Sequence, residues 1–169
     1  MKNSVLHYGI WSALSIFVLF LISSLLKDLD FNTQEIYGYA SIIVSLTFVF
    51  FGIKHFRDTK NHGLLSFRKG LLIGLLITLF AAITFGLYNV VYVEYIDPNF
   101  MTEYYNHSVE NISKTLFGAE LQAKLKQMEE EKDMFSNPFM NFSLMFLTVF
   151  MIGLIISLIS SLILQNKKQ

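Results

Sequence analysis

The stretch Leu71–Val93 reads LLIGLLITLFAAITFGLYNVVYV and contains no charged side chain. A helix of about 20 apolar residues crosses the hydrocarbon core of a bilayer, so this stretch predicts a transmembrane helix. Arg68 and Lys69 precede it, and Glu94 follows it. Because basic residues are retained on the cytoplasmic side of membrane helices, these charges predict that the helix begins in the cytoplasm.

Three further apolar runs, at approximately residues 5–26, 36–53 and 139–164, predict three more spans. The N-terminus, the connection 54–69 and the C-terminus together hold eight basic residues and one acid, a net charge of +7. The other two connections hold five basic residues and twelve acids, a net charge of −7. This alternation predicts an all-α integral membrane protein with four transmembrane helices and both termini in the cytoplasm.

The composition argues against a soluble helical bundle. Hydrophobic residues make up 53% of the 169 residues and charged residues only 15%. Each helix of a soluble bundle needs a polar stripe, and Ile10–Ile22 and Leu144–Ile156 have no charged face. Membrane insertion is therefore the interpretation that the whole chain favours.

Residues 94–138 separate the third and fourth spans and predict a helical insertion outside the cytoplasm. Asp97-Pro98 is a favourable helix start, because the carboxylate can cap the helix and proline needs no partner for an N–H. Helical spacing of apolar residues predicts one helix over Pro98–Leu116 and a second over Ala119–Asp133, with a break at Gly118. The two helices either cover the outer end of the bundle or lie along the lipid headgroups.

A stripe of small residues runs along the third span, one every four residues. We call it the small-residue stripe, and its members are Gly70, Gly74, Thr78, Ala82 and Gly86. The fourth span carries a shorter counterpart: Gly153, Ser157 and Ser161. Small side chains allow helix backbones to approach closely within a membrane. Both sets are therefore candidates for helix packing, either within one chain or between two copies.

The connection 54–69 is basic and rich in histidine. Its cationic side chains are candidates for contact with anionic lipid headgroups or with an acidic partner: Lys54, Arg57, Lys60, Arg68 and Lys69. The same residues also serve as an ordinary positively charged cytoplasmic loop. The histidines of this connection have no cysteine or carboxylate companion at the spacing of metal ligands.

Chemically active patterns are missing from the sequence. No Asp, Glu, Lys or Arg lies inside the four spans, although such residues usually mark ion paths and proton relays. The chain has no cysteine, no Gly-rich phosphate loop, no G-x-S-x-G and no H-E-x-x-H. We therefore expect no catalytic residue, no cofactor, no bound metal and no nucleic acid partner, and we do not expect an enzyme.

Four segments in their order resemble one known family. They are Gly52–Asp58, Ser66–Gly70, Tyr95–Phe100 and Gly153–Leu164. Together they resemble bacterial membrane proteins of unknown function, the family named domain of unknown function four-one-nine-nine. The resemblance covers essentially the whole chain. It implies a four-helix protein of the bacterial inner membrane with a helical insertion before the last span, and it implies no activity.

These observations lead to two expectations about function. The first is a small, non-enzymatic accessory or scaffold protein of the bacterial inner membrane, whose partners are the lipid bilayer and another membrane protein or a second copy. The alternative is an oligomeric transport or channel component with a path lined by hydroxyl groups, since such a path needs no charged side chain.

Overall fold

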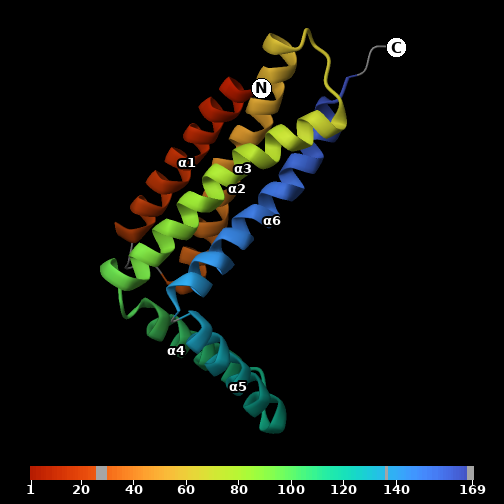
Figure 1. Cartoon of the computed structure of the whole chain (residues 1–169). Helices are drawn as coiled ribbons and strands as arrows, with labels where there is room; N and C mark the ends of the chain where they lie inside the picture. The colour runs from red at the N-terminus through yellow and green to blue at the C-terminus, as the bar shows by residue number, and fades with distance from the viewer. Residues whose placement is uncertain (26–29, 136, 167–169) are drawn as a thin grey trace. The chain divides into compact units, whose positions relative to one another are not determined.

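The computed structural model describes residues 1–25, 30–135 and 137–166, except for the side chains of 131 and 133–135. Its elements are α-helices and two π-helical turns, η1 and η2. In chain order they are α1 (Lys2–Leu25), α2 (Phe31–His55), η1 (Phe56–Lys60), α3 (Phe67–Val91), η2 (Tyr92–Ile96), α4 (Phe100–Ser113), α5 (Gly118–Phe135) and α6 (Pro138–Leu164) (Figure 1). The described residues form no strand beyond an isolated bridge between Leu65 and Asn166.

Within the described residues, four helices are long and apolar enough to cross a membrane, as expected for a multi-pass membrane protein. They are Lys2–Leu25, Phe31–Lys60, Phe67–Ile96 and Pro138–Leu164. The second and third are longer than the apolar runs 36–53 and 71–93, because η1 and η2 continue the helices α2 and α3. Some residues in the expected spans and in the charge comparison lie outside the described residues: Leu26, Lys27, Asp28, Lys167 and Lys168.

The chain divides into two compact units. Unit 1 contains Met1–Phe85 and Met145–Gln169, and unit 2 contains Gly86–Leu144. Unit 1 therefore holds α1, α2, η1, most of α3 and most of α6. Unit 2 holds the remainder of these two helices with η2, α4 and α5.

In unit 1, α1 and α2 form an antiparallel hairpin. The Ser12 hydroxyl of α1 donates to the Ser45 carbonyl oxygen of α2 at 2.8 Å, and Ser45 Oγ lies 3.3 Å from Ser15 Oγ of α1. Nearer the other end of the hairpin, Gly52 of α2 lies against the Tyr8 side chain of α1. Short polar and small residues therefore hold the two helices close together, as in other membrane bundles.

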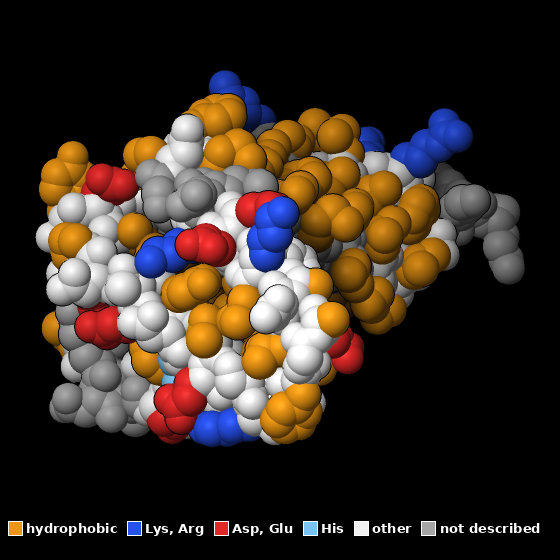
Figure 2. All heavy atoms as spheres, turned by 90° about the horizontal axis from the view of Figure 1, so that it is seen from below, with side chains coloured by type: hydrophobic (Ala, Val, Ile, Leu, Met, Phe, Trp, Pro, Cys, Tyr) orange, Lys and Arg blue, Asp and Glu red, His pale blue; other side chains and the backbone are white. Residues whose placement is uncertain are grey.

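The distribution of side chains in unit 1 is that of a protein surrounded by lipid. Leu46, Ile53 and Ile77 are completely buried, and so are Ser12 and Ser157. Large apolar side chains cover the outside of the helices, among them Ile10, Trp11, Leu72 and Ile155, each about half exposed. Figure 2 shows a broad area of hydrophobic side chains that charged side chains do not interrupt. Such a surface needs a bilayer or a partner around it.

The start of α2 is fixed by Asp30, whose carboxylate caps the helix. Oδ1 accepts from the Thr33 hydroxyl at 2.6 Å and Oδ2 accepts from the Thr33 N–H at 3.0 Å. The side-chain hydrogen bond first, and then the backbone hydrogen bond, lower the pKa of Asp30 below its ordinary value. The cap thus satisfies one of the N–H groups that a helix N-terminus leaves without a partner.

This cap gives a pH prediction. The pKa of Asp30 is lower in the folded state than in the unfolded state. Its ionised carboxylate therefore stabilises the fold above the unfolded-state pKa, and this stabilisation is lost as the pH falls through the folded-state pKa. Asp30→Ala should lower the thermal midpoint of unfolding in detergent at neutral pH. Asp30→Asn should keep most of the capping hydrogen bonds, but its stability should fall less than that of the wild type when the pH is lowered. Unfolding at neutral and acidic pH tests both. An equal acid response in wild type and Asp30→Asn would contradict the assignment.

In unit 2, the first outer helix begins later than the sequence indicated. The first was expected over Pro98–Leu116, but α4 covers Phe100–Ser113. The reason is η2, which carries the preceding helix as far as Ile96, so that the Asp97 N–H donates to the Tyr92 carbonyl oxygen at 2.8 Å. Asp97 therefore ends one helix instead of starting the next, and the chain turns through Pro98 before α4.

The second outer helix, expected over Ala119–Asp133, is α5 and covers Gly118–Phe135. Gly118 does break the chain, with a left-handed φ of 61° that favours glycine. Lys132 of α5 places its Nζ 4.9 Å from the centre of the Tyr105 ring of α4, so the two helices form a hairpin. Asn137 then caps α6: its Oδ1 accepts from the Phe139 N–H at 2.9 Å.

Candidate functional site

The small-residue stripe of α3 faces the small residues of α6 in antiparallel register. A β-carbon added at Gly70 would lie 2.9 Å from Ser161 Oγ, and one added at Gly74 would lie 2.6 Å from Ser157 Oγ. A β-carbon added at Gly153 would lie 2.6 Å from Thr78 Oγ1 and would overlap Thr78 Cγ2. In all three pairs the residue numbers add to the same total, as in two straight antiparallel helices. We call this contact the seam.

Each pair of the seam joins one glycine to one hydroxyl group. Thr78, Ser157 and Ser161 are completely buried, and their hydroxyl oxygens have no hydrogen-bond partner among the described residues. The glycine Cα–H that faces each oxygen is a weak donor, worth about 0.5–1 kcal/mol. A water molecule has no room between the two groups. The seam is therefore a packing surface that these small groups close completely.

The remaining members of the stripe lie further along α3. Ala82 is completely buried in the core of unit 1, as is Val149, which the same register places opposite it on α6. Gly86 belongs to unit 2, where an added β-carbon would lie 2.7 Å from Cδ2 of Phe142. Glycine there makes room for an aromatic ring instead of a hydroxyl group.

The five basic candidates are placed at or next to the ends of α2, η1 and α3 in unit 1. Lys54, Lys60, Arg68 and Lys69 are exposed, while Arg57 is half-buried and its Nε donates to Asp58 Oδ1 at 2.6 Å. Lys69 places its Nζ 5.6 Å from the centre of the buried Phe56 ring. Arg57 and Lys69 therefore have partners within the connection and its flanking turns.

The connection between η1 and α3 is joined to the end of α6. The Leu65 N–H donates to the Asn166 carbonyl oxygen at 2.8 Å, and the Asn166 N–H donates to the Leu65 carbonyl oxygen at 2.8 Å. The Asn166 side chain also donates to the Gly63 carbonyl oxygen at 3.1 Å. We call this contact the Leu65–Asn166 bridge. It places the basic connection and the residue after α6 at the same end of unit 1.

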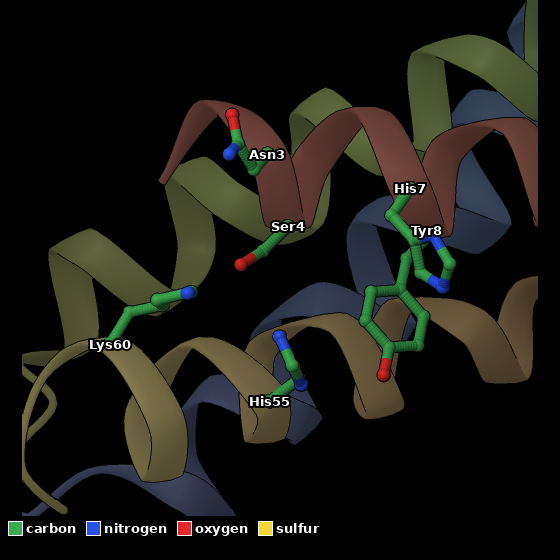
Figure 3. Close-up of a pocket in the computed structure, with 6 residues that line it drawn as sticks. All are labelled: Asn3, Ser4, His7, Tyr8, His55 and Lys60. Carbon is green, nitrogen blue, oxygen red and sulfur yellow. The ribbon is translucent and has the colours of Figure 1, made fainter.

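A pocket of about 290 Å³ opens at this end of unit 1, between the first two turns of α1 and the end of the α2–η1 helix. It is lined by Asn3, Ser4, His7, Tyr8, His55 and Lys60 (Figure 3). Of the basic candidates from the sequence, only Lys60 reaches it. In the figure, the Lys60 ammonium and the Ser4 hydroxyl point toward one another, and the His55 ring lies between Lys60 and Tyr8.

Five residues of this pocket were not recognised as site residues from the sequence. His7 is best interpreted alone as a hydrated histidine near the interface, and His55 as a residue without metal-ligand companions. The register of the α1–α2 hairpin is what brings these residues into one site, because it places the ring centres of Tyr8 and His55 5.5 Å apart. Among the described residues, no group of three or more His, Asp or Glu side chains is arranged to hold a metal ion.

Comparison with known proteins gives one match. Residues 7–166 match the family model described as "Protein of unknown function (DUF4199)". The comparisons with curated proteins and with solved structures find no match. The matched segment begins inside α1 and ends after α6, so it covers most of the first candidate span, the other three spans and both outer helices. The chain therefore belongs to the DUF4199 family, whose function is unknown.

Proposed function

We propose that this protein is a non-enzymatic accessory or scaffold protein of the bacterial inner membrane, with both termini and the basic connection in the cytoplasm. The observation that carries the proposal is the closed seam. Its three hydroxyl groups pack directly against glycine backbone, which leaves no room for a substrate or a hydrated ion between α3 and α6. The polar groups of the bundle thus serve contact between helices.

The orientation is supported by the end of unit 1 where basic residues gather. The Leu65–Asn166 bridge and the pocket place the start of α1, the basic connection and the end of α6 together at this end. Segments that carry a net charge of +7 are retained in the cytoplasm. The acidic hairpin α4–α5, one span further along the chain, then lies outside.

The orientation has a direct test, because the chain has no cysteine and single cysteines can be introduced. Asn61→Cys in the basic connection should react only with membrane-permeant thiol reagents in intact cells. Gln122→Cys in α5 should react with impermeant reagents as well. The reverse pattern, or labelling of both by the impermeant reagent, would contradict the orientation.

The scaffold role is tested by crosslinking the full-length protein in the membrane, followed by purification in mild detergent and mass spectrometry. A partner protein recovered in stoichiometric amount supports the proposal and identifies the process. Catalytic turnover by the pure protein that a single polar substitution abolishes would overturn it.

The alternative, an oligomeric transport or channel component, is favoured by one observation. Thr78, Ser157 and Ser161 have no hydrogen-bond partner among the described residues, so they are available to line a path if the two helices separate. Recovery of the protein as a homo-oligomer without another protein would favour this function. Flux of ions or small solutes through reconstituted liposomes is then the next measurement, and absence of flux would count against it.

A further inference from the structure

The pocket between α1 and η1 has a chemistry that the scaffold role does not use. Every residue that lines it carries an N–H or O–H donor in its side chain, and none carries a carboxylate. Lys60 adds a positive charge. Asp58, the acid on the same turn, is already paired with Arg57 at 2.6 Å. The pocket is therefore suited to an anion.

Ser4 gives the strongest indication that a ligand belongs there. Only 2% of this residue is exposed, and its hydroxyl has no hydrogen-bond partner among the described residues. A buried polar group without a partner costs about 1–3 kcal/mol, so such groups usually serve a purpose. In Figure 3 the hydroxyl points into the space between α1 and Lys60.

The backbone contributes to the same site. Because α1 begins at Lys2, Asn3 and Ser4 lie in its first turn, where the N–H groups have no partner within the helix. The positive end of the helix dipole lies there too and favours a bound anion. The dipole and the Ser4 hydroxyl are independent features of the same pocket.

Neighbouring groups hold the ring of His55 in place. The Thr59 hydroxyl donates its proton to the His55 carbonyl oxygen at 2.7 Å, and its oxygen lies 3.2 Å from His55 Nε2. Tyr8 packs against the other side of the site, with its ring centre 5.5 Å from that of His55.

We propose that this pocket binds a phosphate group, carried either by a soluble phosphate compound or by a lipid headgroup. A phosphate has several acceptor oxygens in a tetrahedral arrangement, which suits donors that come from two helices; a planar carboxylate could use fewer of them. A volume of about 290 Å³ exceeds the roughly 30 Å³ of one water molecule several times over and accommodates the group. The site also lies at one end of two candidate spans, α1 and the α2–η1 helix.

Trp11 provides a reporter for this site. It is the only tryptophan of the chain, and its ring centre lies 6.4 Å from that of His7, which lines the pocket. Full-length protein in phosphatidylcholine nanodiscs is titrated with inorganic phosphate while Trp11 fluorescence is followed, with calorimetry as a second readout. In a parallel arm, nanodiscs with phosphatidic acid are prepared, and native mass spectrometry measures the lipid that stays bound.

Three variants separate specific binding from attraction to a basic surface. Lys60→Gln and Ser4→Ala should each weaken binding of the phosphate group, Lys60→Gln on the order of tenfold. Lys54→Gln removes an equal charge from a nearby exposed residue that does not line the pocket, and it should leave the affinity within about twofold. An equal loss with Lys54→Gln would overturn the proposal, as would no binding in either arm.

Ser4→Ala also separates a ligand role from a structural role. Because the Ser4 hydroxyl has no partner in the described structure, the ligand-free variant should be at least as heat-stable as the wild type while it binds phosphate more weakly. A variant that is less stable and binds normally would overturn the assignment. The two arms identify the source: phosphatidic acid retained without phosphate binding indicates a headgroup, and the converse indicates a soluble phosphate.

Discussion

Replacing Gly153 by leucine should separate α3 from α6 and lower the free energy of unfolding by roughly 3 kcal/mol or more. Even a single β-carbon at this position would overlap Thr78 Cγ2 and would lie 2.9 Å from Thr78 Cβ. The backbones would have to move apart, and the seam would lose its contacts along both helices. Unfolding in mild detergent, by heat or by added denaturing detergent, measures the loss. Gly74→Leu should behave similarly, because Ser157 leaves no space there either.

Smaller substitutions test the same contact more strictly. Gly153→Ala should cost about 1–3 kcal/mol, and Thr78→Ala in the same chain should recover part of this by removing the atoms that overlap. Gly38→Ala is the matched control, since a β-carbon there would lie 3.8 Å from the Phe20 ring, an ordinary contact. If Gly153→Leu and Gly74→Leu both keep wild-type stability, the seam faces lipid and this account is wrong.

Ile77→Ala should lower the free energy of unfolding by about 2 kcal/mol. Ile77 of α3 is completely buried, and its Cδ1 fills the space beside Gly52 of α2. In soluble cores, isoleucine to alanine costs about 2–5 kcal/mol. In a membrane, the free energy of moving the side chain from its surroundings into the core is small, because lipid is as apolar as the core. The cavity and the lost van der Waals contacts therefore account for the effect.

The control for Ile77 lies on the same helix. Ile83 is 44% exposed, so Ile83→Ala makes the same chemical change on the outer surface and should cost less than about 0.5 kcal/mol. Equal losses for the two isoleucine variants would mean that the packed face of α3 is assigned incorrectly.

The four spans and the small residues could be predicted from the sequence, but the register of the seam could not. The length of an apolar run depends on that segment alone, so each span can be predicted without knowledge of the others. A repeat of four residues on α3 fits α6 equally well at several offsets. The structure selects the offset at which each hydroxyl meets a glycine, as at Gly74 and Ser157, and this depends on both backbones together.

The two residue pairs that end in proline show why helix ends were harder to predict. Asp97-Pro98 and Asn137-Pro138 both have a capping side chain followed by proline. Asn137 caps α6, whereas Asp97 accepts a hydrogen bond from the Tyr92 hydroxyl at 3.4 Å and closes η2. The difference comes from the π-helical turn before Asp97, which no local propensity indicates.

The pocket was missed because its residues are far apart in the sequence and unremarkable alone. Ser4 and Lys60 line one pocket only because α1 and the α2–η1 helix are antiparallel and the second helix continues past its apolar run. The apolar pattern ends near residue 53, so Lys60 was assigned to a loop. If the second helix is extended through η1 to Lys60, an antiparallel pairing with α1 places Lys60 near the start of α1, where Ser4 lies.

The Leu65–Asn166 bridge has a consequence for the order in which the protein is assembled. Asn166 follows α6, so its two backbone hydrogen bonds with Leu65 can form only after the last span has been synthesised and inserted. Until then, the turn before α3 lacks these bonds, while the α1–α2 hairpin already has all its own residues. The bridge therefore forms later than the contacts within the α1–α2 hairpin can.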